Sequence, residues 1–356
     1  MSIGDISAWH GPALAPPFAL GGPVGRGTLK ATAEDFLVDE RLGFEADGGV
    51  AHVLLHVEKR ERDTLAVARQ LAQVAGVHPR DVGFAGLKDR LAVARQWFTV
   101  PSSRAAADWA SVEGEGFRVL VAAAHSRKLR RGALSGNAFT LVLRDLEAEP
   151  QELAARLAIV AARGVPNYFG PQRFGRDGSN LESIARWVDG GRLPRGREGR
   201  AFVLSAARSL LFNAVLAERV VSGSWERLLE GECVNLDGRM SWFAAGAIDA
   251  TLEERLARHD IHPTGPMAGR GDGPSAESAA LEARILALYG ELPERLAAEG
   301  LEAARRPLRL RPAEFQGDAG PGSLTLQFRL PPGAYATAVI REIIATDVAP
   351  TELDDA

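Results

Sequence analysis

The sequence predicts an α+β fold, in which a strand-rich domain is interrupted by a second domain of mostly helical structure. Two observations support this division. Short apolar or alternating runs, which are typical of strands, dominate residues 36–143 and return at 308–330. Between them, from about residue 150 to residue 300, apolar residues recur mainly at helical spacing. Strand-rich ends around a helix-rich middle are what an inserted domain produces.

Each expected element follows from its local pattern. A first helix begins at Asp63 or Thr64, either of which can cap it, and ends at Gly76. Further helices are expected over 150–163, 179–188, 205–221, 276–300 and 335–346. Strands are expected over 36–40, 51–57, 96–100, 117–123, 138–143, 308–310 and 323–330. The aromatic, Gly- and Pro-rich segment 165–175 is expected to be a loop, and a structural role for it is favoured over lining a cleft.

Composition excludes several classes of protein. The chain of 356 residues can hold two domains, and no apolar run approaches the ~20 residues that span a membrane. The N-terminal segment lacks the basic start and apolar stretch of a signal peptide. A single cysteine, Cys233, excludes an internal disulfide and a thiolate metal cluster. His259 and His262 have the spacing of metal ligands, but a proline follows and no partner acids lie at helical offsets, so a loop is expected. We therefore expect a cytoplasmic protein without a membrane or metal partner.

The charges are unevenly distributed along the chain. A net charge of −4 does not by itself suggest a nucleic-acid binder. The densest basic cluster, however, is Arg127, Lys128, Arg130 and Arg131, whereas acidic residues concentrate elsewhere. This pattern is compatible with a basic RNA-binding face on an acidic protein. A solvated charged surface explains it equally well, and composition does not separate the two.

The segment GFAGLKDRLAVARQWF, residues 83–98, carries the most chemical information. It places an acid, Asp89, between two cations, Lys88 and Arg90, just after a turn of small residues. Neighbouring positive charge keeps a carboxylate ionised, and an ionised carboxylate can act as a nucleophile or a base. The same cations can instead bind a phosphate backbone, and a charged surface turn is the plainest alternative.

Lysine is scarce in this chain, since only four of its 42 basic residues are lysines. These are Lys30, Lys59, Lys88 and Lys128. Such a bias toward arginine marks the remaining lysines as positions where a compact ammonium does what a planar guanidinium does not. For Lys59, which lies among charged residues, chance retention stays an open explanation.

Six strings of the chain, in order, resemble the TruD family of tRNA pseudouridine synthases. They are LKATAEDFLVDE (29–40), GFAGLKDRLAVARQWF (83–98), HSRKLRRGALSGNAFTLVLR (125–144), GVPNYFGPQRFGRDGSNL (164–181), LSAARSLLFNAVLAERV (204–220) and LPPGAYATAVIREII (330–344). The resemblance implies a catalytic domain with a mixed, mainly antiparallel sheet and flanking helices. It also implies an insertion over 164–304, so that residues 1–163 and 305–356 form the two parts of the catalytic domain.

The resemblance implies isomerisation of a uridine in tRNA, typically at position 13, to pseudouridine. The reaction breaks the N1–C1′ bond, rotates the uracil and rebonds C1′ through C5, so no cofactor is expected; we also expect a monomer. Asp89 matches the catalytic aspartate, which either attacks C1′ or abstracts the C2′ proton. The implied substrate-binding residues are Phe36, Asn137, Phe139, Tyr335, Lys30, Glu34, Lys88 and Arg90. The implied contacts to the RNA backbone are Arg127, Lys128, Arg130 and Arg131.

Most of these residues also have a structural explanation. Each aromatic residue alone is more readily explained by core packing. A surface ion pair explains Lys30 and Glu34 almost as well as a second charged group near the site does. Two other functions are open at this point. One is a non-catalytic RNA-binding protein on the same fold, against which the acid in the Lys-Asp-Arg context argues. The other is a glycoside hydrolase, for which no second carboxylate has an obvious claim.

Overall fold

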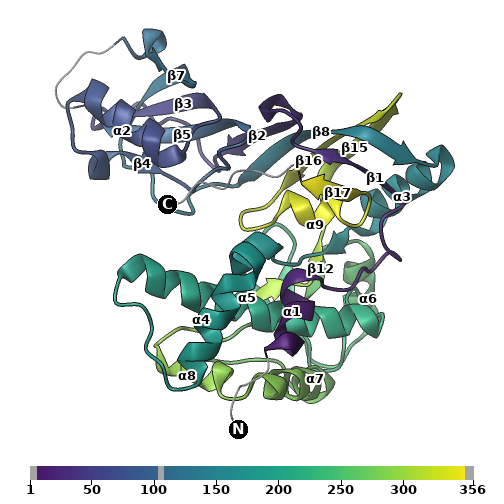
Figure 1. The fold of residues 1–356 in the computed structure, drawn as a ribbon. Helices are drawn as coiled ribbons and strands as arrows, with labels where there is room; N and C mark the ends of the chain where they lie inside the picture. The colour runs from purple at the N-terminus through teal and green to yellow at the C-terminus, as the bar shows by residue number, and fades with distance from the viewer. Residues whose placement is uncertain (1–5, 103–107, 349–356) are drawn as a thin grey trace. The chain divides into compact units, whose positions relative to one another are not determined.

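The computed structural model describes residues 6–102 and 108–348 (Figure 1). The chain divides into two compact units. We call residues 23–162, 312–333 and 343–356 the sheet unit, and residues 1–22, 163–311 and 334–342 the helical unit. The helical unit starts next to the predicted start of the insertion, but it extends to Arg311 and also takes up residues 1–22 and 334–342. The domain boundaries given by the sequence therefore stay a prediction.

An eleven-stranded sheet forms the sheet unit in the described part of the chain. Its main path runs β15-β16-β8-β2-β5-β3-β7-β6, with β1 pairing β8 and β17, and β4 pairing β5. Only β1–β17 and β2–β5 pair in parallel among the described strand pairs of this sheet, so the expected mixed, mainly antiparallel sheet is confirmed. The strands are β1 Gly25–Leu29, β2 Phe36–Arg41, β3 His52–Arg60, β4 Gly83–Phe84, β5 Val93–Pro101, β6 Glu113–Gly114, β7 Phe117–His125, β8 Gly136–Ala148, β15 Ala313–Gly320, β16 Ser323–Leu330 and β17 Ala345–Val348.

The helix α2, Thr64–Ala75, packs against the β3–β5 part of this sheet. It begins after Asp63 in extended conformation and ends at Gly76, whose φ of 63° is the left-handed conformation that closes many helices. Buried residues of α2, β3 and β5 form one hydrophobic cluster, as expected from the helical spacing of its apolar residues. The other long helix of the sheet unit, α3, spans Pro150–Arg163 as predicted.

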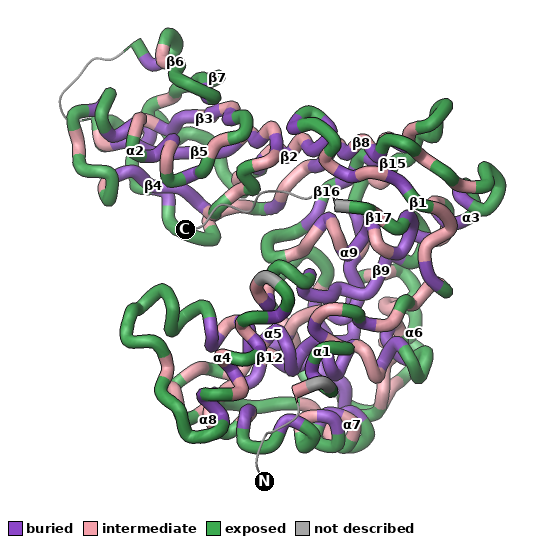
Figure 2. Tube along the Cα trace, in the orientation of Figure 1, coloured by how far each residue is buried: buried purple, intermediate pink, exposed green. Residues whose placement is uncertain are grey.

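The helical unit is built around a long helix, α5, which packs against strand β12 (Figure 2). Its helices are α1 Ser7–Leu14, α4 Ser179–Val188, α5 Arg197–Val221, α6 Ala250–Ala257, α7 Ala276–Leu286, α8 Leu292–Ala298 and α9 Ala336–Ile340. Its strands are β9 Val165–Pro166, β10 Cys233–Leu236, β11 Trp242–Ala244, β12 Ile261–Met267, β13 Ala304–Pro307 and β14 Arg309–Leu310. The sheet order is β11-β10-β12-β13, with a separate β14-β9 pair.

Three helix predictions were wrong in extent. The helix expected over 205–221 begins eight residues earlier, at Arg197. The helix expected over 276–300 is two helices, because a short 3-10 turn and Gly290, with a φ of 57°, separate α7 from α8. The helix expected over 335–346 ends at Ile340, and residues 345–348 form strand β17. Backbone hydrogen bonding to β1 outcompetes the helical spacing there.

Helix α5 is long and apolar enough to cross a membrane by length and composition, and no other helix in the described residues passes this test. About two-thirds of its most apolar window, 67%, is buried inside the structure. Extensive burial of this kind is typical of the core helix of a globular unit.

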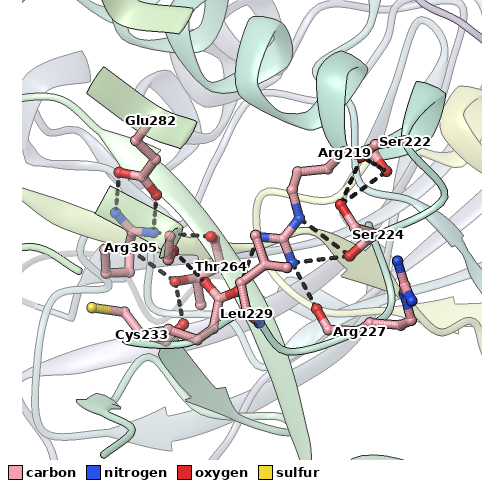
Figure 3. Close-up of polar contacts among 11 residues, drawn as sticks. Arg219, Ser222, Ser224, Arg227, Leu229, Cys233, Thr264, Glu282 and Arg305 are labelled. Carbon is pink, nitrogen blue, oxygen red and sulfur yellow. Dashed lines mark hydrogen bonds and ion pairs between the residues drawn. The ribbon is translucent and has the colours of Figure 1, made fainter. Parts of the chain in front are cut away.

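Two buried ion pairs lie in the helical unit (Figure 3): Arg219 of α5 pairs with Glu232, directly before β10, and Arg305 of β13 pairs with Glu282 of α7. Arg219 donates to Glu232 at 2.9 Å and to the main-chain oxygens of Ser224 and Arg227. Burial raises the pKa of the Glu232 carboxyl, and the neighbouring Arg219 opposes that rise. The second oxygen of Glu232 accepts a hydrogen bond from Ser278 at 3.2 Å. These charges satisfy one another, as buried ionic groups must.

Replacing Arg219 should therefore test how much the buried network contributes to stability. Arg219→Met removes the charged partner of the buried Glu232 and one donor to each of the carbonyls of Ser224 and Arg227, and we expect the free energy of unfolding to fall by about 3–5 kcal/mol. Arg284, whose side chain is 60% exposed, pairs with Glu218 on the surface of the same unit. Arg284→Met should cost less than about 1 kcal/mol. Urea unfolding of both variants measures the two losses in free energy of unfolding. Equal losses would contradict a larger contribution from the buried Arg219 network than from the exposed Arg284 pair.

Candidate active site

The side chain of Asp89 lies on an irregular loop between β4 and β5 and is 60% exposed. Its carboxylate accepts a hydrogen bond from the ammonium of Lys30 at 2.8 Å. Lys30 directly follows β1 and has a φ of 60°, a left-handed conformation that non-glycine residues adopt at an energetic cost. The Asp89 carboxylate is thus paired with Lys30, which is far away in sequence, whereas the adjacent Lys88 pairs with Glu40.

An aromatic cluster adjoins this ion pair. The Lys30 ammonium lies 4.2 Å from the centroid of the Phe36 ring. Phe36 packs edge-on against Phe139, and Phe139 packs against Phe328 with 5.5 Å between ring centroids. The register pairs Val38 with Phe139 across β2 and β8, so side chains two residues apart on these strands share one face. The strand pairing therefore brings the predicted residues Phe36 and Phe139 together with Lys30 and Asp89.

The position of Phe36 is fixed by the turn before it. Thr32 and Asp35 form a capping box around a short 3-10 turn, and Asp35 also accepts a forked pair of hydrogen bonds from Arg144 on β8. These hydrogen bonds from Arg144, together with those from Thr32, hold the pKa of the Asp35 carboxyl below its usual value despite burial. An ionised, buried carboxylate thereby anchors the residue next to the aromatic ring.

Glu40 was missed by the sequence analysis, although it is fully buried beside the candidate site. Its carboxylate forms an ion pair with the ammonium of Lys88 at 2.5 Å and accepts a hydrogen bond from the main-chain nitrogen of Trp97 at 3.1 Å. Glu40 lies four residues after Phe36 on β2, so both belong to the same face of the strand. The alternation Phe36, Val38, Glu40 was the available signal, because it places an acid at a buried position.

Asn137 lies opposite Glu40 in the β2–β8 pairing. Its side-chain oxygen Oδ1 is buried and has no hydrogen-bond partner among the described residues. A buried amide oxygen without a partner is unusual, because leaving it unsatisfied costs ~1–3 kcal/mol. This oxygen is therefore an unsatisfied acceptor in the β2–β8 strand pair.

The basic cluster at 127–131 packs against the segment that precedes the Asp89 loop. Gly132 donates its main-chain N–H to the oxygen of Ala85 at 2.7 Å, and the guanidinium of Arg131 lies 3.9 Å from the Phe84 ring centroid. A side chain at Gly83 would collide with the main chain of Leu129, so this close approach requires glycine. The predicted backbone-binding residues are all exposed, and they are Arg127, Lys128, Arg130 and Arg131.

The chain matches the family model of tRNA pseudouridine synthase D (TruD) over residues 18–192 and 198–343. The chain belongs to the TruD family. The tRNA pseudouridine synthase D of Nitrosococcus oceani is 47% identical over 332 residues, covering 92% of this chain and 93% of that protein. That of Pseudomonas aeruginosa is 46% identical over 346 residues, covering 95% of each. A crystal structure of a putative TruD from Methanosarcina mazei shares the fold, with a TM-score of 0.69 at 21% identity over 94% of this chain and 96% of that chain.

Three further residues that the TruD resemblance singled out have the following surroundings. Glu34 is exposed, and its ion-pair partner is Arg60, at 2.8 Å, rather than Lys30. Arg90 is exposed on the loop, next to Asp89. Tyr335 belongs to the helical unit, where its ring packs edge-on against Phe169.

Two segments without an expected catalytic role have structural contacts. In the aromatic segment 165–175, the main-chain nitrogen and oxygen of Phe169 both bond to the buried amide of Asn213. This contact supports the structural role that the sequence analysis favoured. His262 lies in strand β12 rather than in the predicted loop, and it bonds to Asp237 at 2.7 Å and to Arg309 at 3.0 Å. Groups of three or more acids, histidines or cysteines placed to hold a metal are not found in the described residues.

The anchor of Phe36 gives a testable pH dependence. Because the folded-state pKa of Asp35 is lowered, its stabilisation is present at neutral pH and is lost as the pH falls below ~4. We expect Asp35→Asn to reduce the free energy of unfolding at pH 7 by about 1.5–3 kcal/mol, and the difference from wild type to shrink toward pH 3.

The exposed pair Arg26–Glu147, with side chains 68% and 63% exposed, supplies the control. Glu147→Gln should change stability by less than about 1 kcal/mol at either pH. Urea unfolding at pH 7 and pH 3.5 measures both effects. A constant difference between Asp35→Asn and wild type at the two pH values would argue against an ionised Asp35.

Proposed function

We propose that this protein converts a uridine of tRNA, at position 13, to pseudouridine with Asp89 as the catalytic carboxylate. The observation that carries the proposal is the Asp89 carboxylate, held by Lys30 next to the ring of Phe36. Membership of the TruD family supplies the substrate class, and the sequence resemblance supplies position 13.

The contacts suggest a role for each group. The target base must leave its stack before a carboxylate reaches its ribose, and an exposed Asp89 beside an aromatic cluster suits a base that has been turned out. Phe36 and Phe139 offer apolar surface to the uracil. The unpartnered Oδ1 of Asn137 suits the N3–H of uracil, which is a donor. Lys30 holds the Asp89 carboxylate by an ion pair at 2.8 Å.

In the reaction the N1–C1′ bond breaks and a C5–C1′ bond forms. Asp89 either adds to C1′ and is displaced by C5, or removes the C2′ proton to give a glycal and later returns it. In both routes C5 loses its proton and N1 gains one, so the product is an isomer of the substrate. Both routes require the same ionised carboxylate near the ribose.

Asp89→Asn is expected to abolish turnover, because the amide can neither attack C1′ nor accept a proton. The fold and the affinity for tRNA should stay nearly unchanged, since the side chain is mostly exposed. Pseudouridine mapping of unmodified tRNA transcripts incubated with each purified protein, without added cofactor, makes the measurement.

Conversion at uridine 13 by the wild-type protein alone is the expected outcome. Conversion at another uridine would refute the position but keep the enzyme. Tight tRNA binding with no conversion by either protein would favour the non-catalytic RNA-binding alternative. Wild-type turnover by Asp89→Asn would remove Asp89 from the mechanism.

The exposed arginines of the basic cluster give a second prediction. Arg127→Ala and Arg130→Ala should each weaken tRNA binding, because both side chains are exposed beside the segment that leads to Asp89. The slope of log affinity against log salt should flatten by about 0.7–0.9 for each phosphate that the variant no longer neutralises. Filter binding between 50 and 200 mM salt measures the slope, with Arg284→Ala in the helical unit as the control. An unchanged slope would place the RNA backbone elsewhere on the protein.

A further inference from the structure

Lys59, one of the four lysines of the chain, is fully buried and contacts the loop that carries Asp89. It lies near the end of β3, on the α2 side of the sheet. Its ammonium donates to the main-chain oxygens of Arg62 at 2.6 Å, Asp89 at 2.7 Å and Lys88 at 3.4 Å. Chance retention, which was open for Lys59 from the sequence, does not account for an ammonium with three carbonyl acceptors.

Two further buried side chains hold the same loop. The main-chain nitrogen of Lys88 donates to the hydroxyl of Thr64 at 3.1 Å, and that hydroxyl donates to the side-chain oxygen of Gln96 at 3.0 Å. The amide nitrogen of Gln96 in turn donates to the oxygen of Gly86 at 2.6 Å. Lys59, Thr64 and Gln96 are each at most 1% exposed. Main-chain groups of three loop residues are therefore tied to side chains that are buried and fixed by packing.

We propose that Lys59 is a positioning residue for the reaction, whose ammonium fixes the main chain of Asp89 so that the carboxylate stays beside Lys30. This inference rests on the proposed catalytic role of Asp89. Nearly all of the loop lacks the ladder hydrogen bonds of a strand, so its geometry depends on these side chains. A displacement of about 1 Å at a reacting group can cost ~10²-fold in rate.

The charge state of Lys59 gives the inference a readout. Burial lowers the pKa of the Lys59 ammonium to about 8, although the nearby carboxylates of Asp89 and Asp63 favour its charged form, and Lys88 disfavours it. A charged ammonium has three N–H donors for three carbonyls, whereas the neutral amine has two and turns a lone pair toward the third. The loop should therefore lose one of its anchors as the pH rises through about 8.

Global stability should respond in the opposite direction. Because the folded-state pKa of Lys59 lies below its unfolded value of ~10.4, the unfolded chain binds more protons between about pH 8 and pH 10. The contribution of Lys59 to the free energy of unfolding therefore rises with pH in this window. If deprotonation of Lys59 lowers turnover above pH 8, the contribution of Lys59 to the free energy of unfolding should not fall over the same pH range.

The experiment compares wild type with Lys59→Met, Thr64→Val and a control variant, Arg118→Met. Arg118 is 62% exposed on the adjacent strand β7 and pairs with Glu58, so its replacement removes a cation without touching the loop. For each protein, kcat and KM for the tRNA transcript are measured from pH 6.5 to 9.5. Melting curves and hydrogen exchange of amides 86–90 at pH 7 are measured alongside.

We expect Lys59→Met to lower kcat by 10- to 100-fold with KM changed less than threefold, and to speed amide exchange in the loop. The fall of wild-type kcat above pH 8 should disappear in Lys59→Met and persist in Thr64→Val, whose kcat should fall about tenfold. Arg118→Met should match wild type throughout. Titration of the RNA itself is common to all four proteins and cancels in the comparison.

The inference is overturned if folded Lys59→Met keeps kcat within twofold of wild type. It is also overturned if the fall of kcat above pH 8 persists in Lys59→Met. If Lys59→Met does not fold, Thr64→Val and the pH profile of wild type decide. Full kcat in Thr64→Val, together with a wild-type kcat that is constant across pH 8, would overturn the inference. A lowered kcat in Thr64→Val, together with a wild-type kcat that falls above pH 8, would support it. A wild-type protein that makes no pseudouridine refutes the proposed function and this inference together. Active wild type with unaffected variants refutes this inference alone.

Discussion

The candidate site depends on one constraint, which is that an irregular loop must hold an exposed carboxylate at a defined place. Backbone hydrogen bonding cannot do this alone, since the loop between β4 and β5 is largely unpaired. Buried polar side chains from β2, β3, α2 and β5 hold it instead, and they are Glu40, Lys59, Thr64 and Gln96. Each of these groups is expensive to bury, and each is satisfied mainly by a loop atom.

This constraint explains why an arginine-rich chain keeps lysine at these positions. An ammonium is a compact donor that fits a cluster of carbonyl oxygens from different chain segments, whereas a guanidinium presents a flat fork suited to a carboxylate. Lys59 binds three carbonyls, and Lys88 reaches a single oxygen of Glu40 in a buried site. Lys30 packs on an aromatic face while it binds Asp89. Two of the four lysines therefore bind Asp89, and a third, Lys88, belongs to the same loop.

The spacing of apolar residues along the sequence predicted those helices and strands whose limits depend on neighbouring residues. The bounds of α3 and β16 follow from helical and alternating spacing, and both were predicted to the residue. The strands around 233–267 were missed, because Ile261–Met267 contains two prolines and a glycine that argue against an internal strand. Strand β17 was missed because its pairing with β1 is set by a partner more than 300 residues away in the chain.

The same distinction applies to the candidate site. Asp89, Phe36 and Phe139 lie in strings that resemble a family, so the sequence could single them out. That Lys30 rather than Lys88 contacts Asp89 depends on where β1 ends relative to the loop, which no local pattern encodes. Strand alternation places Glu40 on the buried face with Phe36 and Val38, but that Glu40 and Gln96 contact the loop follows only from the packing.

The two lysines that hold Asp89 act on different parts of it. Lys30 binds the carboxylate, and so bears on its direction, whereas Lys59 binds the main-chain oxygen, and so bears on the position of the whole residue. Lys30 is partly exposed and strained in a left-handed conformation, a cost that persists only where surrounding contacts determine the geometry. Lys59 is buried, so its attachment is shielded from solvent and salt. An exposed carboxylate that stays accessible to a large RNA can be rigid only if its anchor lies beneath it, and the buried ammonium supplies that anchor.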